Sequence, residues 1–314
     1  MERPKNKNEY RKNIAEMFLK ILEEDGLNWV KTWKATSPQV PFNGITKIRY
    51  KGLNNINLGI IAMMNEYKDP RWYTMVQIMD KKGTYHKGQK WHLQKGTKAA
   101  FVEYWFPYDS IKKKMLTWTE YNNALKSNRD PKDFVLCSRY TAVFNASCID
   151  GIPELKKYEN NDVQVDNLIT TLSTNMNVEI NYDGIDRAYY VPDEDKIHLP
   201  EISSFTSSEA FNTTALHELA HSTGHKSRLN RDIKNYFGSN DYAFEELIAE
   251  MTACFMSFNI NIEVSDEHMQ NHKAYIQSWV QSIKQKPDVL TKAIKAAQEA
   301  ADYMEQKANI LVQA

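Results

Sequence analysis

The sequence contains few cysteines and no long hydrophobic run, and both shortages narrow the class of protein. Only three cysteines occur among 314 residues, at Cys137, Cys148 and Cys254, and no two of them form a C-x-x-C pair. This argues against a disulfide framework and against a cysteine zinc knuckle, so we expect buried thiols. No stretch approaches the ~18 to 20 consecutive apolar residues of a membrane helix, and residues 1–12 lack the apolar core of a secretion signal. These features predict a soluble, cytoplasmic protein that does not enter a membrane.

The net charge is zero, but this balance hides an uneven distribution. Residues 1–150 contain 26 Lys and Arg against 15 Asp and Glu, a net charge of +11, whereas residues 151–314 contain 14 and 25, a net charge of −11. Six of the seven tryptophans also lie in the basic half. The length allows two ordinary domains. We therefore expect an N-terminal domain over residues 1–153, a linker over 154–161 and a C-terminal domain over 162–314.

Residue patterns predict a sheet in the basic half and mainly helices in the acidic half. Apolar residues at helical spacing predict a helix over 8–24, followed by a loop over 28–57 and a short helix near 58–67. Alternating β-branched and aromatic residues predict antiparallel strands within 73–106 and 134–144. The acidic half is predicted to contain a helix, a strand, a hairpin and four further helices, at 163–173, 178–182, 189–199, 206–224, from 240 onwards, 268–284 and 289–306. The predicted fold class is α+β in two domains.

The strongest chemical signal is the motif HELAH at residues 217–221, within the predicted helix 206–224. Its two histidines are four residues apart and project from one helical face, so both imidazoles can reach one ion while Glu218 lies beside that ion. His217 and His221 are therefore predicted to bind one Zn²⁺, which in a catalytic site has three protein ligands. Glu218 would act as the general base for hydrolysis of a peptide or amide bond.

A third ligand has to come from outside this motif. Glu246 lies on a separate predicted helix, 25 residues after His221, and Glu250 follows one turn later on the same face. We predict that Glu246 binds the metal and that Glu250 accepts the far N–H of a ligating histidine and so orients it. Other acidic residues of this segment remain open as substitute ligands: Asp241, Glu245 and Glu250.

Three more side chains are expected near this site. His225 follows the predicted helix, and we expect it to cap the helix end or to support a ligand. Tyr190 and Tyr242 could each donate to a developing oxyanion, and Tyr190 is taken as the catalytic candidate; core packing is the other role open to both. A metal that only stabilises the fold, without turnover, is the alternative interpretation of the whole site.

The basic half combines cationic and aromatic residues in three segments: WVKTWK at 29–34, ITKIRYKGLN at 45–54 and HKGQKWHLQKGTK at 86–98. Phosphates favour diffuse positive charge and unstacked bases favour flat aromatic faces, so this composition is typical of proteins that bind single-stranded nucleic acid. Burial in the core is the other fate open to each aromatic residue. The candidate contact residues are Trp29, Trp33, Lys47, Arg49, Tyr50, Lys51, Arg71, Trp72, Lys87, Lys90, Trp91, Lys95 and Lys98.

Longer segments carry a resemblance that is nearly end to end. They include PFNGITKIRYKGLN, DPRWYTMVQ, KGQKWHLQKGTKAAFVEYW and YTAVFNASCIDGIP in the first half, and RAYYVPDEDKIHLP, HELAHSTGHKSRLNR and YAFEELIAE in the second. Through these segments the chain resembles the ArdC-type antirestriction proteins of conjugative plasmids and related mobile elements. The segment EELIAEM also resembles the third-ligand helix of thermolysin-type gluzincins. The resemblance implies a single-stranded-DNA-binding domain followed by a zincin-like metallopeptidase domain.

We therefore expect an antirestriction protein that binds single-stranded DNA, carries one Zn²⁺ in a gluzincin-like site and protects incoming DNA from host restriction. Its protein substrate would be a host restriction component or the chain itself. The alternative is a protein that coats single-stranded DNA and whose metal site is structural. A third hypothesis is a soluble peptidase whose basic half binds an acidic protein.

Overall fold

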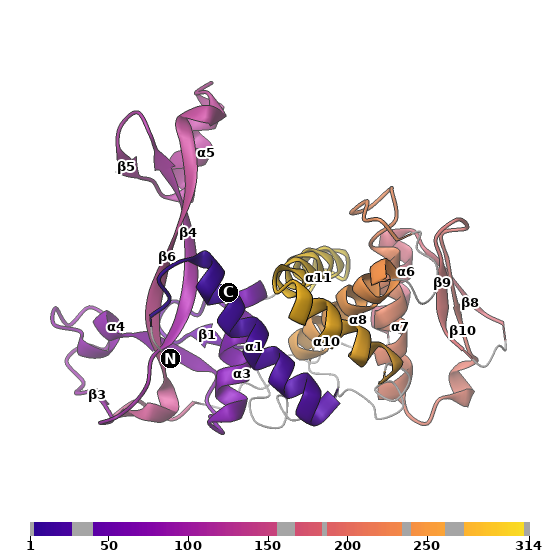
Figure 1. The fold of residues 1–314 in the computed structure, drawn as a ribbon, viewed down its shortest axis with the longest axis horizontal. Coiled ribbons are helices and arrows are strands. Elements are labelled where there is room, and N and C mark those ends of the chain that lie inside the picture. The colour runs from indigo at the N-terminus through magenta and orange to yellow at the C-terminus, as the bar shows by residue number, and fades with distance from the viewer. Residues whose placement is uncertain are drawn as a thin grey trace. The chain divides into compact units, whose positions relative to one another are not determined.

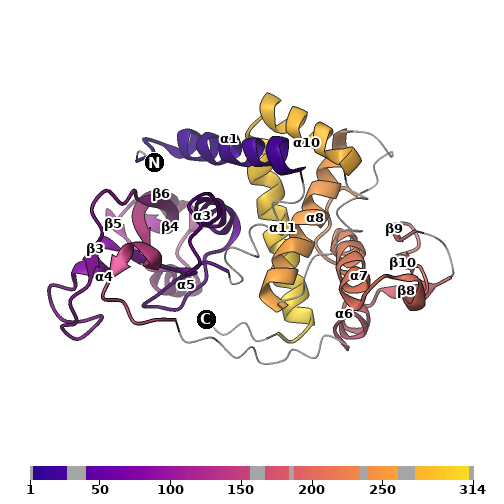
Figure 2. The same cartoon turned by 90° about the horizontal axis from the view of Figure 1, so that it is seen from below.

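The computed structural model describes residues 3–26, 40–155, 167–183, 187–233, 240–260 and 273–310. The candidate DNA contacts Trp29 and Trp33 lie outside these ranges. Contacts divide the chain into two compact units, which Figure 1 and Figure 2 show from two sides. Unit 1 consists of residues 1–5 and 72–152, and unit 2 consists of residues 6–71 and 153–314.

Unit 1 is built around antiparallel strands, as its alternating aromatic and β-branched residues predict. The strands of its main sheet are β2 (Arg71–Thr74), β6 (Phe134–Asn145), β4 (Ala100–Asp109) and β5 (Lys114–Met115), in that spatial order. β4 pairs with β6 along its whole length, from Ala100 opposite Val143 to Asp109 opposite Phe134. Figure 1 shows this two-stranded ribbon continuing beyond the rest of the unit, with β5 and the helix α5 (Trp118–Lys126) at its far end.

Short elements complete unit 1. They are α4 (Met75–Met79), 3-10 helices at Pro131–Asp133 and Ala146–Cys148, and the antiparallel pair β3 (His92–Leu93) and β7 (Ile149–Asp150). Both α4 and α5 begin with a capping box, formed by Thr74 with Gln77 and by Thr117 with Glu120. The segment between the two long strands thus contains β5 and α5.

Unit 2 is mainly helical. Its helices are α1 (Lys7–Asp25), α3 (Gly52–Met64), α6 (Leu168–Met176), α7 (Ser208–Ser222), α8 (Asn240–Ile260), α10 (Lys273–Gln285) and α11 (Asp288–Lys307). Its strands are β1 (Phe42–Asn43) and a three-stranded sheet in the order β8 (Glu179–Tyr182), β10 (Lys196–Leu199) and β9 (Tyr189–Val191), and a 3-10 helix follows at Ile202–Ser204. β10 is parallel to β8 and antiparallel to β9, which confirms the predicted hairpin. α7 packs against this sheet on one side and against α8 on the other, and α8 also contacts α10 and α11.

The first two helices of the part of the chain that the structure describes belong to unit 2. α1 buries an apolar stripe that includes Ile14, Phe18 and Leu22, and it packs against α10, α11 and α3. α3 begins at Gly52, earlier than the short helix expected near 58–67, and packs against α11. The observed division therefore differs from the expected one over residues 6–71.

Three smaller expectations can be compared directly with the structure. Cys148 and Cys254 are buried free thiols as expected, whereas Cys137 is only partly buried because it lies on the ribbon. The pattern Thr206-x-x-Glu209 predicts Thr206 as the N-terminal cap of α7, but the cap is Ser207, whose hydroxyl accepts from the amide of Ala210. No helix in the described part of the chain is both long enough and apolar enough to span a membrane.

Candidate metal centre

Two buried helices, α7 and α8, supply the predicted metal ligands. α7 carries His217, Glu218 and His221, and α8 carries Glu246 in a segment whose residues 245–256 are all buried. Both helices are buried on most of their circumference, as expected for helices enclosed by other elements. The polar side chains of the site are consequently held in a dry environment, where each of them needs a partner.

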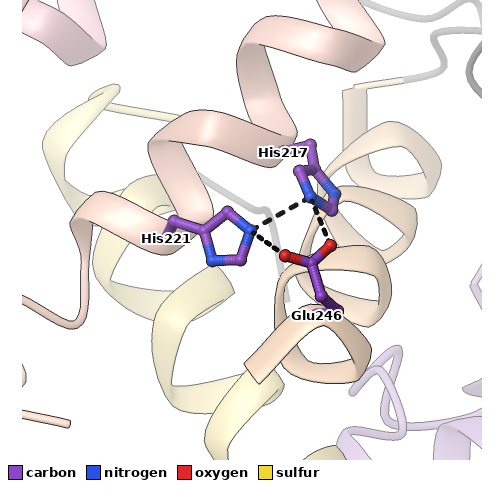
Figure 3. Close-up of side chains that lie close together, drawn as sticks. All are labelled: His217, His221 and Glu246. Atoms are coloured by element: carbon purple, nitrogen blue, oxygen red, sulfur yellow. Dashed lines mark hydrogen bonds and ion pairs between the residues drawn. The ribbon is translucent and has the colours of Figure 1, made fainter. Parts of the chain in front are cut away.

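The three predicted ligands converge. His217 Nε2 lies 3.1 Å from His221 Nε2, and the carboxylate oxygens of Glu246 lie 3.5 Å from His217 Nε2 and 3.4 Å from His221 Nε2. Figure 3 shows the three side chains pointing toward one another, two from α7 and one from α8. Within the described ranges, these are the residues whose His, Cys, Asp or Glu donor atoms are grouped closely enough to hold a metal ion.

The distances between these donor atoms fit a tetrahedral metal site. With bonds of about 2.0–2.1 Å from zinc to nitrogen or oxygen, two ligand atoms in a tetrahedron are about 3.3 Å apart. The two imidazole nitrogens are 3.1 Å apart, and each lies 3.4 or 3.5 Å from a different carboxylate oxygen of Glu246, all close to this value. The donor set of two imidazoles and one carboxylate is also the set found in catalytic zinc sites of the gluzincin type. The cluster is therefore suited to hold a divalent cation.

The far nitrogen of each histidine faces another glutamate of α8. His217 Nδ1 lies 3.5 Å from Glu250, as the sequence predicts, and His221 Nδ1 lies 3.4 Å from Glu245. A carboxylate in this position fixes the ring tautomer and directs the lone pair of Nε2 at the metal. Glu245, considered in the sequence only as a substitute ligand, is thus placed to orient His221.

Glu245 is itself held by Arg231, which follows α7 in the chain. The guanidinium of Arg231 donates to both carboxylate oxygens of Glu245, at 2.6 and 3.1 Å. It also donates to the hydroxyl of Thr223 at 2.6 Å and to the carbonyl of Ala220 at 3.0 Å. Sequence reasoning missed this arginine because a loop position gives no periodic signal that relates it to a helix face.

The pKa values of the histidines and of Glu246 are shifted by one another's charge. Burial lowers the pKa of His221, but hydrogen bonds to Glu245 and Glu246 outweigh it and raise the pKa to about 9. The pKa of His217 is also raised well above its usual range, against burial, by Glu246 and Glu250. Burial raises the pKa of Glu246, but the two imidazoles outweigh it and hold that pKa far below the usual range. Without metal, protons on the imidazoles therefore balance the carboxylates.

Replacement of Arg231 by alanine is expected to weaken zinc binding by roughly 10- to 100-fold, the usual effect of losing support behind a metal ligand. The reason is that Glu245 would lose its bidentate partner and would hold His221 less firmly. The dissociation constant can be measured by competition with a chromophoric zinc chelator. Lys226→Ala, at an exposed position of the same loop, is the matched control and should bind zinc like the wild type. Equal affinity in both variants would contradict this role of Arg231.

Two tyrosines flank the metal ligands. Tyr242 of α8 hydrogen-bonds with Glu246 and with Tyr275 of α10, and their rings are 5.9 Å apart. Burial, together with the charge of Glu246, raises the pKa of both hydroxyls; Glu218 adds to the shift of Tyr275. Both therefore remain protonated donors at neutral pH. Tyr242 was predicted near the site, whereas Tyr275 was not.

Tyr190 and His225 belong to a different network. The hydroxyl of Tyr190 donates to Asp195 at 2.7 Å and accepts from Arg228 at 3.4 Å. His225 Nδ1 lies 2.8 Å from the hydroxyl of Ser227 and 3.4 Å from Asp195. The structure thus gathers these two predicted site residues around Asp195 rather than among the three metal ligands.

The DNA-contact candidates in unit 2 are mostly engaged within that unit. Arg49 donates to Asn259 at 3.1 Å, and Lys51 pairs with Asp302 at 2.7 Å. Lys47 is exposed, with its ammonium 5.7 Å from the ring centre of Phe42. Each of these cationic side chains already contacts another residue of unit 2.

The structure contradicts the prediction for Arg71, whereas Tyr50 is only partly buried. Arg71 is 7% exposed, pairs with Asp69 at 2.7 Å and donates to the carbonyl of Pro153 at 2.9 Å, so its charge is already neutralised in the interior. Burial raises the pKa of Tyr50, and a hydrogen bond with Asn43 partly offsets this. A phosphate cannot reach a guanidinium in this state without disrupting the fold.

The candidates in unit 1 divide into buried and exposed residues. Trp72 is 1% exposed and cannot offer its face to a base. Trp91 is partly exposed, stacked on His86 with ring centres 4.2 Å apart and edge-on to Tyr73 at 5.3 Å. The lysines of this segment are all exposed: Lys87, Lys90, Lys95 and Lys98.

Two family models match the chain and together span most of it. The N-terminal domain of the anti-restriction factor ArdC matches residues 8–144, and a zincin-like metallopeptidase domain matches residues 166–299. Residues 8–144 belong to the ArdC N-terminal domain family, and residues 166–299 belong to the zincin-like metallopeptidase family. The resemblance seen in the sequence is thereby confirmed, and the second match places His217, His221 and Glu246 within a zincin-like domain.

Solved structures of an ArdC protein have a fold similar to that of this chain. Crystal structures of the antirestriction protein ArdC from plasmid R388, one metal-free and one Mn(II)-bound, both give a TM-score of 0.71. The sequence identities are 26% and 27%, and the matches cover 95% and 96% of this chain and 97% and 98% of those chains. The two-domain α+β architecture and a divalent-metal site are therefore confirmed, and zinc is the metal expected of zincins.

Some relatives are much longer proteins that contain a segment similar to this chain. Two DNA primases named TraC from Escherichia coli are 33% and 31% identical over 95% and 93% of this chain. The chain spans only 27% and 19% of their lengths. An uncharacterised protein of Sinorhizobium fredii, y4eC, is 24% identical over 96% of this chain and 93% of its own length.

Proposed function

We propose that this chain is an antirestriction protein of a mobile genetic element, in which one chain combines single-stranded-DNA binding with a zinc-dependent peptidase centre. The observation that carries the proposal is the convergence of His217, His221 and Glu246, with Glu218 beside them on α7. Membership of residues 8–144 in the ArdC N-terminal domain family and the plasmid origin of the solved ArdC protein support the biological role. The protein substrate would be a host restriction component or the chain itself.

The number of ligands favours catalysis over a structural metal. Structural zinc sites are closed by four protein ligands, whereas catalytic sites use three and keep one position open. Among the residues that the structure describes, three donors meet at this cluster, and the neighbouring Glu245 and Glu250 face the opposite nitrogens of the histidine rings. An open position is what hydrolysis requires, so the hypothesis of a DNA-coating protein with a structural metal is less favoured.

Each residue then has a definite task. When bound, a divalent cation would polarise a peptide carbonyl and acidify a water molecule. Glu218, buried beside His217, accepts the proton from the attacking water and passes it to the leaving amine. Tyr242 and Tyr275 are protonated donors that can stabilise the negative charge on the carbonyl oxygen. The dry surroundings strengthen each of these interactions.

The proposal is tested by transfer of an unmodified plasmid into recipients that do or do not possess a restriction system. Expression of this chain is expected to raise transfer into the restricting recipient toward the level seen without restriction, and to change nothing in the recipient that lacks restriction. An empty vector supplies the baseline. Unchanged transfer into the restricting recipient, with the protein present and folded, would contradict the antirestriction role.

A further inference from the structure

The ribbon of β4 and β6 in unit 1 has two chemically different faces. Directly opposed residues of paired strands share a face, and alternate residues along one strand do too. The register therefore places Tyr104, Phe106 and Tyr108 of β4 on one face, together with Arg139 of β6. We call this the aromatic face. Cys137 and Val135 of β6 and Met115 of β5 extend it.

The aromatic face is accessible. Tyr104 is 44% exposed, Met115 50% and Val135 51%, and Arg139 is exposed as well. The rings of Tyr104 and Phe106 lie 6.3 Å apart with an interplanar angle of 21°, so they form a nearly continuous platform. The guanidinium of Arg139 lies 5.1 Å from the ring centre of Tyr104. Large apolar surfaces that stay exposed in a folded unit usually mark a binding site.

Charge separates the two faces. The acidic residues of the paired strands, Glu103 and Asp109, both lie on the opposite face, where Glu103 accepts from Tyr140 and Asp109 pairs with Arg129. The aromatic face carries no carboxylate from either strand and one guanidinium. A polyanion can approach it without electrostatic repulsion from the strands. This combination of flat rings and positive charge is less suited to an apolar protein surface than to unstacked bases on a phosphate backbone.

We propose that the aromatic face binds single-stranded DNA, with bases stacked on Tyr104, Phe106 and Tyr108 and a phosphate paired with Arg139. This rests on the proposed function, because it assigns a location to DNA binding. Alternate residues of a strand are about 6.8 Å apart. Bases stacked in a duplex are spaced at about 3.4 Å. A row with the wider spacing favours an extended, unstacked strand over a duplex.

The test measures the affinity of the full chain for a labelled oligothymidine of about twenty nucleotides by fluorescence anisotropy. Loss of one stacking partner usually weakens binding by roughly 5- to 100-fold, so this decrease is expected for Tyr104→Ala. Tyr104→Phe keeps the ring and should bind like the wild type. Leu136→Ala removes a side chain that is 55% exposed on the opposite face of the same ribbon, and it should also bind like the wild type. Thermal melting checks that every variant is folded.

A second measurement does not depend on mutation. Photocrosslinking with an oligonucleotide that contains 5-iodouracil should join the base to Tyr104, Phe106 or Tyr108, identified by mass spectrometry. If the wild type binds the oligonucleotide but Tyr104→Ala binds equally well and crosslinks appear elsewhere, the aromatic face is the wrong location while the proposed function stands. If the wild type does not bind at all, DNA binding itself is wrong. A wild-type dimer in sedimentation that Tyr104→Ala dissociates would assign the face to a second copy of the chain.

Discussion

Glu218→Gln is expected to abolish proteolysis while leaving zinc and DNA binding almost unchanged. The amide has nearly the same size as the carboxylate but cannot accept the proton of the attacking water, and general acid–base catalysis contributes about 100- to 10,000-fold to a rate. Glu218 is not one of the three converging ligands, so the metal should remain. Zinc content, affinity for an oligothymidine and cleavage of an unfolded protein substrate measure the three properties separately.

The same variant distinguishes a catalytic centre from a structural one in cells. Protection of unmodified DNA against restriction is expected to be lost in Glu218→Gln if it depends on cleavage. Glu201→Gln, an exposed glutamate before α7, is the matched control and should protect like the wild type. Full protection by Glu218→Gln would instead mean that occupancy of the DNA, rather than hydrolysis, is what defends it.

Most of the metal centre could be predicted from the sequence because helical periodicity is a local property. The spacing of His217 and His221 on one helix determines that both rings share a face, and the same rule relates Glu246 to Glu250. Periodicity does not say which neighbouring helix packs on that face. The role of Glu245 was missed for this reason: adjacent residues on a helix point about 100° apart, and only the packing of α8 against α7 lets both Glu245 and Glu246 reach His221.

The two family-model matches, 8–144 and 166–299, leave a boundary where the charge changes, whereas contacts group residues 6–71 with the C-terminal half, because charge is a poor guide to contacts. The change from a basic to an acidic half near residue 150 suggested a boundary there, but opposite charges attract. Lys51 pairs with Asp302, and Arg11 lies 3.9 Å from Asp288, so basic residues of the first half serve as partners for acidic residues of the last helix within unit 2. An amphipathic stripe likewise shows that α1 buries one face without showing against which helix.

Sequence patterns also do not show which of the predicted DNA-contact residues are buried. Composition identifies segments that are rich in Lys, Arg and Trp, but it cannot separate a buried ring such as Trp72 from an exposed one such as Tyr104. A strand register can, because it assigns every side chain to one of two faces. Residues 100–106 were correctly predicted as strand, but their alternate aromatic residues were not recognised as DNA-contact candidates because they lack adjacent lysines.

Zinc affinity is expected to rise steeply between about pH 7 and pH 9. In the metal-free cluster, hydrogen bonds to Glu245 and Glu246 outweigh burial and raise the pKa of His221 to about 9. A proton on a ligand nitrogen has to leave before zinc can bind there. Apparent affinity therefore falls about tenfold for each pH unit below that pKa, or roughly 100-fold between pH 9 and pH 7 from His221 alone. The raised pKa of His217 acts in the same direction.

Competition with a chromophoric chelator at several pH values measures this slope, and calorimetry in buffers of different ionisation enthalpy counts the protons released. His225→Ala is the control, since His225 contacts Ser227 and Asp195 rather than the cluster, and its slope should match the wild type. A zinc affinity that stays constant from about pH 7 to pH 9 would show that the imidazoles are not protonated in the metal-free protein.

The stability of the metal-free protein should fall with pH between about 6.5 and 9, whereas that of the zinc-loaded protein should change much less. The folded-state pKa of His221 in the metal-free protein, about 9, lies above the unfolded value of about 6.5. Its contribution to the free energy of unfolding is therefore fully present below about pH 6.5 and is lost as the pH rises through about 9. The melting temperature of the metal-free protein should fall across this window. Zinc stabilises the folded state in proportion to the logarithm of its affinity, so the gap between zinc-loaded and metal-free melting temperatures should widen over the same range. A gap that stays constant would contradict proton displacement as the step that couples metal binding to folding.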